Sequence, residues 1–147
     1  MRSTRMAAWA AVAVVLLASQ PARAADAPLP VRIRVLEGSR QGPPGVPPGL
    51  EDLRAQLSAT AYVRWEQAGE VQASMQPRQA VPVSLPGGGS VSVTLVEARA
   101  GAATFEVSAP GSRTQSRVTV PPGKRIVQQV TAERGGRAWF VTIKAGG

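Results

Sequence analysis

The segment that decides the fold is Gln79–Val107, with the sequence QAVPVSLPGGGSVSVTLVEARAGAATFEV. Apolar and polar residues alternate in three runs within it, at 80–85, 91–95 and 103–107. Because a period of two places one set of side chains on each face of a sheet, the segment predicts three consecutive strands. The first turn is predicted at 86–89, where three glycines supply positive φ angles, and the second at 99–102.

Pro82 lies in the middle of the first of these runs. Proline has no backbone N–H and cannot donate to a β-ladder, so we expect this strand at the edge of a sheet. Runs with one apolar and one polar face are typical of antiparallel sheets that expose one face to water, and we expect that arrangement here.

Alternating runs extend the pattern in both directions along the chain. Upstream, they predict strands at 31–35, 61–67 and 71–75, with a turn near Gly69 between the last two. Downstream, they predict a strand ending at Val120 and two more at 126–130 and 139–143. Gln128 and Gln129 interrupt the alternation, and a β-bulge would account for that.

The sequence predicts one short helix, at Pro48–Ala59. Leu50, Leu53 and Leu57 fall on one face of it, and acidic residues occupy its first turn, where the helix dipole favours them. We expect this helix to form a lid over one open edge or end of the sheets. The segment before it, 38–49, is rich in proline and glycine and is predicted to be a loop.

These elements together predict an all-β fold, an antiparallel β-sandwich of about nine short strands with one short helix in its N-terminal half. A closed barrel is the alternative. Residues 25–147 have the length of a single domain, and a chain of that size buries enough apolar surface to fold without disulfides.

Residues 1–24 have the pattern of a secretory signal peptide. Arginines precede an apolar run from Met6 to Ala18, and the small-x-small sequence Ala22-Arg23-Ala24 follows it. An N-terminal membrane anchor is the alternative, but the run of 13 residues is shorter than the roughly 20 that a bilayer requires. We therefore expect cleavage before Ala25, no transmembrane segment thereafter, and a periplasmic or extracellular protein with no nucleic-acid partner.

Positive charge is concentrated in the last part of the chain. Residues 107–147 carry seven Lys and Arg against Glu133 alone, a net charge of +6, whereas the whole chain has +8. Such a region can bind polyanions, although a solvated surface is the more ordinary interpretation. The candidate binding residues in it are Arg113, Arg117, Lys124, Arg125, Arg134 and Arg137.

Catalysis is disfavoured because the sequence contains no histidine and no cysteine. Nucleophilic triads and zinc, haem and iron–sulfur sites all require these residues, so we expect no catalytic residue, no metal and no cofactor. A pair of carboxylates, as in glycosidases, is the remaining option. Strand parity predicts that Glu97 and Glu106 point to opposite faces, which disfavours such a pair.

Aromatic residues accompanied by arginine are the other candidate binding groups, since aromatic and arginine side chains dominate interface energetics. Trp65 and Trp139 are in phase with apolar residues, so we expect both in the core. Tyr62 and Phe140 lie on the opposite faces of the same strands, and we expect them to be exposed. Together with Arg64 they complete the candidate binding surface.

The order of these signals resembles a known type of protein. A leucine-patterned helix is followed by YVRWEQ, then by VPVSLPGGGSVSVTL, a further strand pair, and a terminal strand after a glycine pair. This series over residues 49–145 resembles small exported β-sandwich proteins of uncharacterised function from myxobacteria and related bacteria. The resemblance implies a fold and a compartment, and it implies no site residues.

The functional expectation is a non-catalytic, exported binding or assembly module of the bacterial cell envelope that acts through protein–protein contacts. The alternative is a carbohydrate- or polyanion-binding module that uses the basic C-terminal third. The partner would accordingly be an envelope protein or an acidic polysaccharide.

Overall fold

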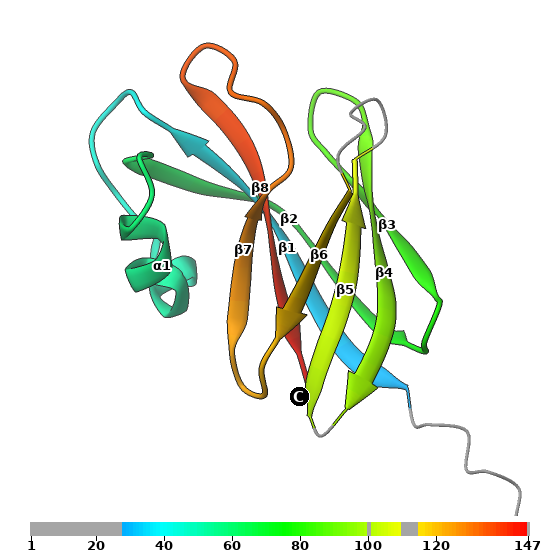
Figure 1. The fold of residues 1–147 in the computed structure, drawn as a ribbon. Coiled ribbons are helices and arrows are strands. Elements are labelled where there is room, and N and C mark those ends of the chain that lie inside the picture. Colours follow the sequence, from blue (N-terminus) through cyan, green and yellow to red (C-terminus); the bar gives the residue numbers. More distant parts are fainter. Residues whose placement is uncertain (1–27, 100, 110–114, 147) are drawn as a thin grey trace, which may run out of the picture.

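The computed structural model describes residues 28–99, 101–109 and 115–146, so the predicted signal peptide and Arg113 lie outside the described residues. The chain forms two four-stranded antiparallel sheets that face each other (Figure 1). Sheet A has the order β2-β1-β8-β7 and sheet B the order β3-β4-β5-β6. The elements are β1 (Leu29–Ser39), η1 (Pro48–Leu53), α1 (Arg54–Ser58), β2 (Arg64–Met75), β3 (Ala80–Ser84), β4 (Ser90–Arg99), β5 (Ala102–Ser108), β6 (Gln115–Val120), β7 (Arg125–Gln129) and β8 (Arg137–Ala145).

The predicted β-sandwich is confirmed, with eight described strands rather than about nine. The difference arises at β2, which was predicted as two strands with a turn near Gly69. The chain instead continues as one strand, and the pairing with β1 shifts so that Val35 faces Gly69 and Leu36 faces Gln67. Ala68 is therefore the extra residue of a β-bulge, which bends the strand without ending it.

The three strands predicted from the central segment form as consecutive neighbours β3, β4 and β5. The predicted position of Pro82 at a sheet edge is also confirmed. The bulge expected at Gln128 and Gln129 is absent, because β7 pairs with β8 in an unbroken register. Gln128 simply occupies an inward-facing position at the edge of sheet A.

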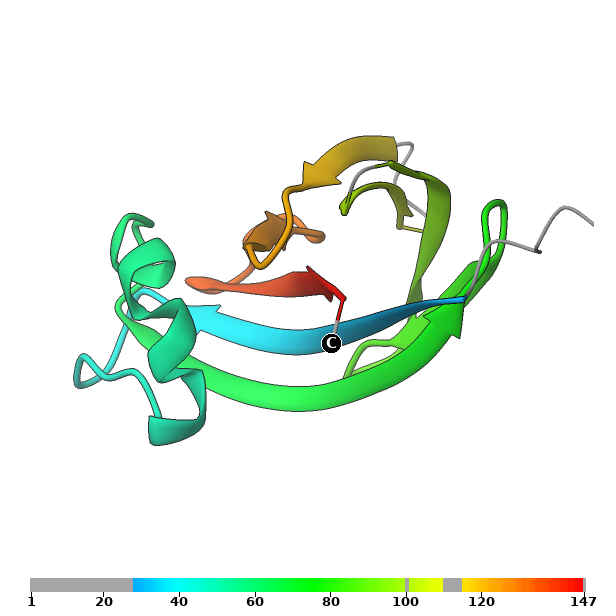
Figure 2. The same ribbon diagram turned by 90° about the horizontal axis from the view of Figure 1, so that it is seen from below.

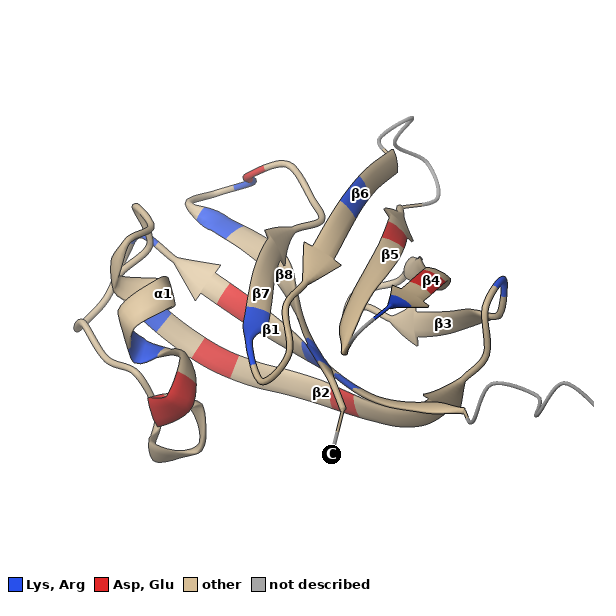
Figure 3. Cartoon of the chain, turned by 60° about the horizontal axis from the view of Figure 1, so that its bottom comes forward, with Lys and Arg blue, Asp and Glu red and all other residues tan. Residues whose placement is uncertain are grey.

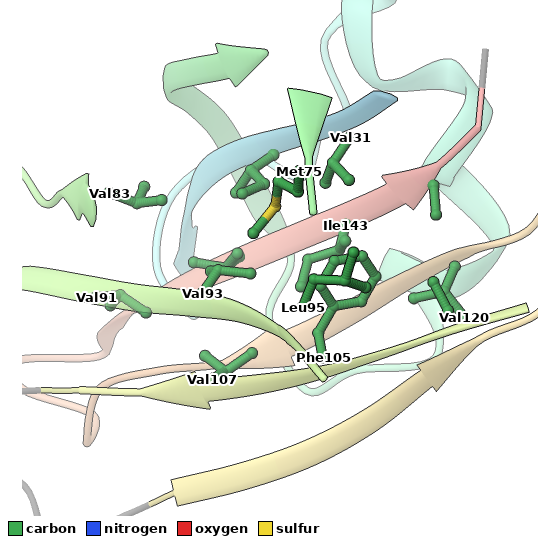
Figure 4. Close-up of a cluster of buried hydrophobic side chains, with 14 of the residues drawn as sticks. Val31, Met75, Val83, Val91, Val93, Leu95, Phe105, Val107, Val120 and Ile143 are labelled. Carbon is green, nitrogen blue, oxygen red and sulfur yellow. The ribbon is translucent and has the colours of Figure 1, made fainter. Parts of the chain in front are cut away.

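The main core lies between the two sheets (Figure 4). Inward-facing residues of β1 and β8, such as Ile33 and Ile143, pack against residues of β4 and β5, such as Leu95 and Phe105. All four side chains are at most 1% exposed. Burying an aliphatic or aromatic side chain of this size contributes about 1.5–3 kcal/mol, so this layer is the main source of stability.

A second core lies on the opposite face of sheet A, under the helical segment. Leu36 of β1 has the opposite parity to Val35, so its side chain points away from sheet B. There it packs with the three leucines predicted for the helix face, Leu50, Leu53 and Leu57, which are fully buried. The helix is shorter than predicted, a 3-10 turn followed by five α-helical residues, and it covers an outer face of sheet A (Figure 2).

Candidate functional site

A groove opens at the end of the sandwich where the β3–β4 turn of sheet B faces the β7–β8 loop of sheet A. Its volume is about 510 Å³. Residues 85–90 form one wall, and the residues that follow β7, together with the start of β8, form the other. The groove therefore lies between the two sheets, at the end opposite the β6–β7 turn (Figure 1).

The floor of the groove is apolar. Leu85, Ala109, Val130 and Trp139 line it, and each is a half-buried residue that packs against the main core. Trp139 was expected in the core, and the structure places it at this boundary, where it is half-buried against the main core and also lines the groove. The turn wall carries Gly87, Gly88 and Gly89, which have no side chains to narrow the opening.

A second hollow of about 350 Å³ adjoins the first. The two share four lining residues: Ala109, Val130, Thr131 and Ala132. The second hollow runs between β6 and β7, where Gln128 Nε2 lies 3.5 Å from Ser116 Oγ. Together they form one elongated groove, with an apolar floor and polar amides and hydroxyls along its side.

No acidic residue lies among the described residues that line this elongated groove. Its hydroxyl groups, Ser90, Ser116 and Thr131, accordingly have no carboxylate within the lining to act as a base, and the sequence contains no histidine. Histidine and carboxylates are the most common general bases in acyl transfer and hydrolysis.

The charged wall of the groove consists of Arg134 and Arg137, which flank a tight turn. Arg134 N–H donates to Arg137 O at 2.9 Å, and Arg137 N–H donates to Arg134 O at 3.1 Å. Gly135 and Gly136 between them have φ angles of 60° and 76°, as a type I′ turn requires at both central positions. Because the two arginines exchange both hydrogen bonds, they are a directly opposed pair and their side chains share one face of the hairpin.

The expectation that Tyr62 and Phe140 are exposed is wrong. They are 7% and 4% exposed, because Phe140 of β8 and Tyr62, which precedes β2, both pack with the leucines of the helical segment in the second core. With Trp65, which is buried as expected, they form a cluster of edge-to-face rings whose centroids are 4.8–6.0 Å apart. The guanidinium of Arg40 lies 5.0 Å from the Tyr62 ring centroid and covers it from outside. These rings belong to the second core.

The basic candidate residues do not gather on one surface (Figure 3). Arg117 is on β6 of sheet B, Lys124 is in the β6–β7 turn and Arg125 is the first residue of β7. Arg134 and Arg137 are beyond the other end of β7. Three of them face carboxylates: Arg117 lies 3.7 Å from Glu106, Arg125 lies 2.9 Å from Asp52, and Arg137 lies 3.6 Å from Glu37. Arg64 similarly pairs with Glu66 at 3.0 Å. The positive charge that is concentrated in the sequence is therefore largely dispersed and partly neutralised in the fold.

Among the described residues, two of the candidate cations, Lys124 and Arg134, have no ion-pair partner. Lys124 lies in the β6–β7 turn at the far end of the sandwich, and only Arg134 lines the groove. The nearest acidic residue in sequence, Glu133, forms a close ion pair with Arg40 instead.

The prediction that Glu97 and Glu106 point to opposite faces of the sheet is also wrong. The β4–β5 register shifts between Leu95 and Glu97, so Glu97 faces Thr104, which shares a face with Glu106. Both carboxylates thus lie on the outer face of sheet B. Each lies near an arginine, Glu97 at 3.6 Å from Arg99 and Glu106 at 3.7 Å from Arg117, and neither lines the groove.

Each sheet edge carries a feature that hinders the addition of a further strand. On β3, Leu85 N–H donates to Gly89 O and Leu95 N–H donates to Gln79 O, which fixes the alternation of the ladder. Pro82 and Ser92 therefore form a non-hydrogen-bonded pair, in which the backbone groups of Pro82 point away from β4. The outer edge of β3 thus lacks a backbone N–H donor at Pro82. On β2, the loop residue Gly45 exchanges hydrogen bonds with Val63 and Trp65 and covers the start of the edge.

The edge of β7 is blocked by side chains. Val130 N–H donates to Trp139 O, so the outward groups of β7 belong to Arg125, Val127 and Gln129. Gln56 Nε2 donates to Arg125 O at 2.8 Å, and Gln128 Nε2 donates to Gln129 O at 3.3 Å. On β6 the charged Arg117 occupies the middle of the strand. Strand addition is therefore a poor mode of recognition for this fold, and the groove is the better candidate.

Comparisons with known proteins return nothing that narrows the function: no family model, curated protein or solved structure matches this chain. Residues 28–99, 101–109 and 115–146 contain no group of three or more acidic side chains arranged to hold a metal ion. No helix within those ranges combines the length and apolar character that crossing a membrane takes.

Proposed function

We propose that this protein is an exported, non-catalytic binding module of the bacterial cell envelope, and that it holds an extended segment of a partner protein in the elongated groove. The observation that carries the proposal is that the two hollows adjoin and share four lining residues, Ala109, Val130, Thr131 and Ala132. A long groove with an apolar floor and polar sides accommodates a chain whose alternate side chains point inward and outward.

Two further features support binding over catalysis and favour a protein segment as the ligand. The described lining contains no carboxylate, and the sequence supplies no histidine or cysteine. The floor is largely aliphatic, with Trp139 as its one aromatic residue among the described residues. Apolar side chains of a peptide fit such a floor better than saccharide rings, which stack on aromatic faces.

The carbohydrate or polyanion alternative draws less support from the geometry. It was based on a basic C-terminal third, and that third is divided between the two sheets with three of its arginines beside carboxylates. A polyanion would require several unpaired cations on one face. Retention on an acidic polysaccharide, with a steep salt dependence, remains the measurement that would favour it.

Site-specific photocrosslinking in the native cell envelope tests the proposed function. A photoreactive residue at Thr131, inside the groove, should yield one discrete protein adduct, whereas the same residue at the exposed Gln72 on β2 should yield none. Ala132→Trp, which fills the shared part of the groove, should abolish the Thr131 adduct. Equal adducts from Thr131 and Gln72, or an adduct indifferent to Ala132→Trp, would contradict the proposal.

A further inference from the structure

We propose that Arg134 and Arg137 form a carboxylate clamp, and that the partner segment held in the groove presents an acidic group to it. This inference rests on the proposed function and specifies the chemistry of the partner.

The hairpin geometry forces the two side chains together. Arg134 and Arg137 are mutually hydrogen-bonded across the Gly135–Gly136 turn, and such an opposed pair has Cα atoms about 5.5 Å apart. Like charges directly opposite each other destabilise an antiparallel pair. An anion held between the two guanidinium groups reverses that effect, because each guanidinium can donate paired N–H groups to a carboxylate.

The charges nearby leave room for such an anion. Glu133, the acidic neighbour of Arg134 in the sequence, forms a close ion pair with Arg40. Glu37 lies 3.6 Å from Arg137, but the Arg137 side chain is still 70% exposed. Arg134 is exposed and has no ion-pair partner among the described residues. Arg134 therefore retains a positive charge that no described carboxylate balances, and Arg137 is balanced only by Glu37.

The clamp and the apolar floor belong to one site, since Arg134, Arg137 and Trp139 line the same hollow. Arg137 and Trp139 are two residues apart on β8, so both side chains project from one face of the strand. A ligand that satisfies the site therefore combines a carboxylate with an adjacent apolar side chain. In a protein segment, that carboxylate is either the side chain of Asp or Glu or the free chain end.

Three matched peptide pools test the inference, each with mixed apolar residues around a central position. One pool has central Glu and blocked ends, one has central Gln and blocked ends, and one has central Gln and a free C-terminal carboxylate. The purified mature protein should bind one of the carboxylate pools more tightly than the neutral pool. Which carboxylate pool binds identifies the source, and Trp139 fluorescence follows binding because the other tryptophan of the mature chain, Trp65, is buried.

Charge variants provide the control. Arg134→Gln with Arg137→Gln should lower the affinity for the preferred carboxylate pool by about tenfold, the loss expected for a solvent-accessible charged hydrogen bond. Lys124→Gln with Lys144→Gln removes the same net charge away from the groove and should leave the affinity within about twofold.

Two results would overturn the clamp in different ways. Equal binding of all three pools, unchanged by the arginine substitutions, would eliminate the clamp while leaving the groove as a site for protein segments. Retention of a polyuronate by the wild-type protein, with no peptide pool bound, would eliminate both the clamp for protein segments and the proposed partner class. The photocrosslinking experiment distinguishes these cases independently, since it reports a protein in the groove whatever its charge.

Discussion

Arg34 on β1 donates two hydrogen bonds to Asp52 on the helical segment, from Nη1 to Oδ1 at 3.2 Å and from Nη2 to Oδ2 at 2.9 Å. The Arg34 side chain is only 5% exposed, and its Nη1 also donates to Gly49 O at 3.3 Å. On the other side of Asp52, Arg125 Nε lies 2.9 Å from Oδ2, an ion pair without hydrogen-bond geometry. One carboxylate thus links the helical segment to both β1 and β7.

We expect Asp52→Ala to destabilise the protein by about 1–3 kcal/mol, because it removes the carboxylate that accepts two hydrogen bonds from the buried Arg34 guanidinium and leaves it only the Gly49 carbonyl. The loss of stability should not exceed this range, because the Asp52 side chain is 28% exposed and water reaches it. Urea unfolding of the protein measures the change. The neighbouring Glu51→Ala removes only an exposed ion pair with Arg54 and should cost less than about 0.5 kcal/mol. Equal losses for the two variants would contradict a structural role for Asp52.

Stability should fall as the pH decreases from about 5 to about 2. Burial by itself raises the pKa of Asp52, but the hydrogen bond and charge of Arg34 and the charge of Arg125 outweigh it and hold the pKa below its ordinary value. A carboxyl with a lowered folded-state pKa stabilises the protein above its unfolded-state pKa, and that contribution is lost as the pH falls through the folded-state pKa.

Urea midpoints across this pH range measure the effect, and Asp52→Ala should show a shallower loss than the wild type. The hydrogen bond from Arg32 likewise lowers the pKa of Glu70, so part of the acid sensitivity should persist in the variant. An identical pH profile for the two proteins would show that Asp52 does not titrate with folding.

Gly38→Ala should destabilise the second core by about 1–3 kcal/mol. A Cβ at this position would lie 3.0 Å from Phe140 Cε2 and 3.1 Å from two carbons of the Trp65 ring, in a cluster that has no free space. Gly49→Ala is the matched control, since a Cβ there meets nothing within 4 Å and the position is helical, where alanine is favoured. Thermal unfolding of both variants gives the comparison; a neutral Gly38→Ala would mean that the rings can move apart.

The strands were predictable because their side chains follow a period of two in which one face is apolar. That rule holds wherever only one face of a strand is buried, as on β4, where Val91, Val93 and Leu95 face the core. It fails for Tyr62 and Phe140, whose rings belong to the face that the rule assigns to water. The helical segment covers that face, and a single sequence does not show which face of which sheet a short helix will cover.

The groove was not predictable for a similar reason. Trp139 was noted together with Arg137 as an aromatic–arginine cluster, Arg134 was noted only among the basic residues of the last third, and the glycine-rich turn was interpreted only as a turn. Trp139 and the two arginines lie on one side of the groove, and the glycine-rich turn lies on the opposite side. They face each other because sheets A and B stack with the β7–β8 loop and the β3–β4 turn at the same end of the sandwich. The Arg-Gly-Gly-Arg sequence is the one local signal that indicates a site, since a two-residue turn places its flanking residues opposite each other.

Pro82→Thr should increase self-association of the protein. The substitution supplies an outward-facing N–H at the middle of β3, and threonine is well suited to a strand. Analytical ultracentrifugation over a range of concentrations measures the association. Ser84→Thr is the control: it changes the next outward-facing residue of the same edge without adding a donor, and it should leave the protein unchanged. If the two variants behave alike, the proline does not protect the edge.

Arg134→Glu should stabilise the unliganded protein while it abolishes binding of the acidic peptide pool. The substitution turns a directly opposed pair of like charges into a pair of opposite charges, which is worth roughly 0.2–1 kcal/mol across two strands. The gain in the urea midpoint should shrink at high salt, because the pair is exposed and screened. A stabilised variant that no longer binds would show that the like-charged pair is maintained for its ligand. If Arg134→Glu instead lowers stability, the arginines already hold a partner within the chain and the hairpin is not a vacant clamp.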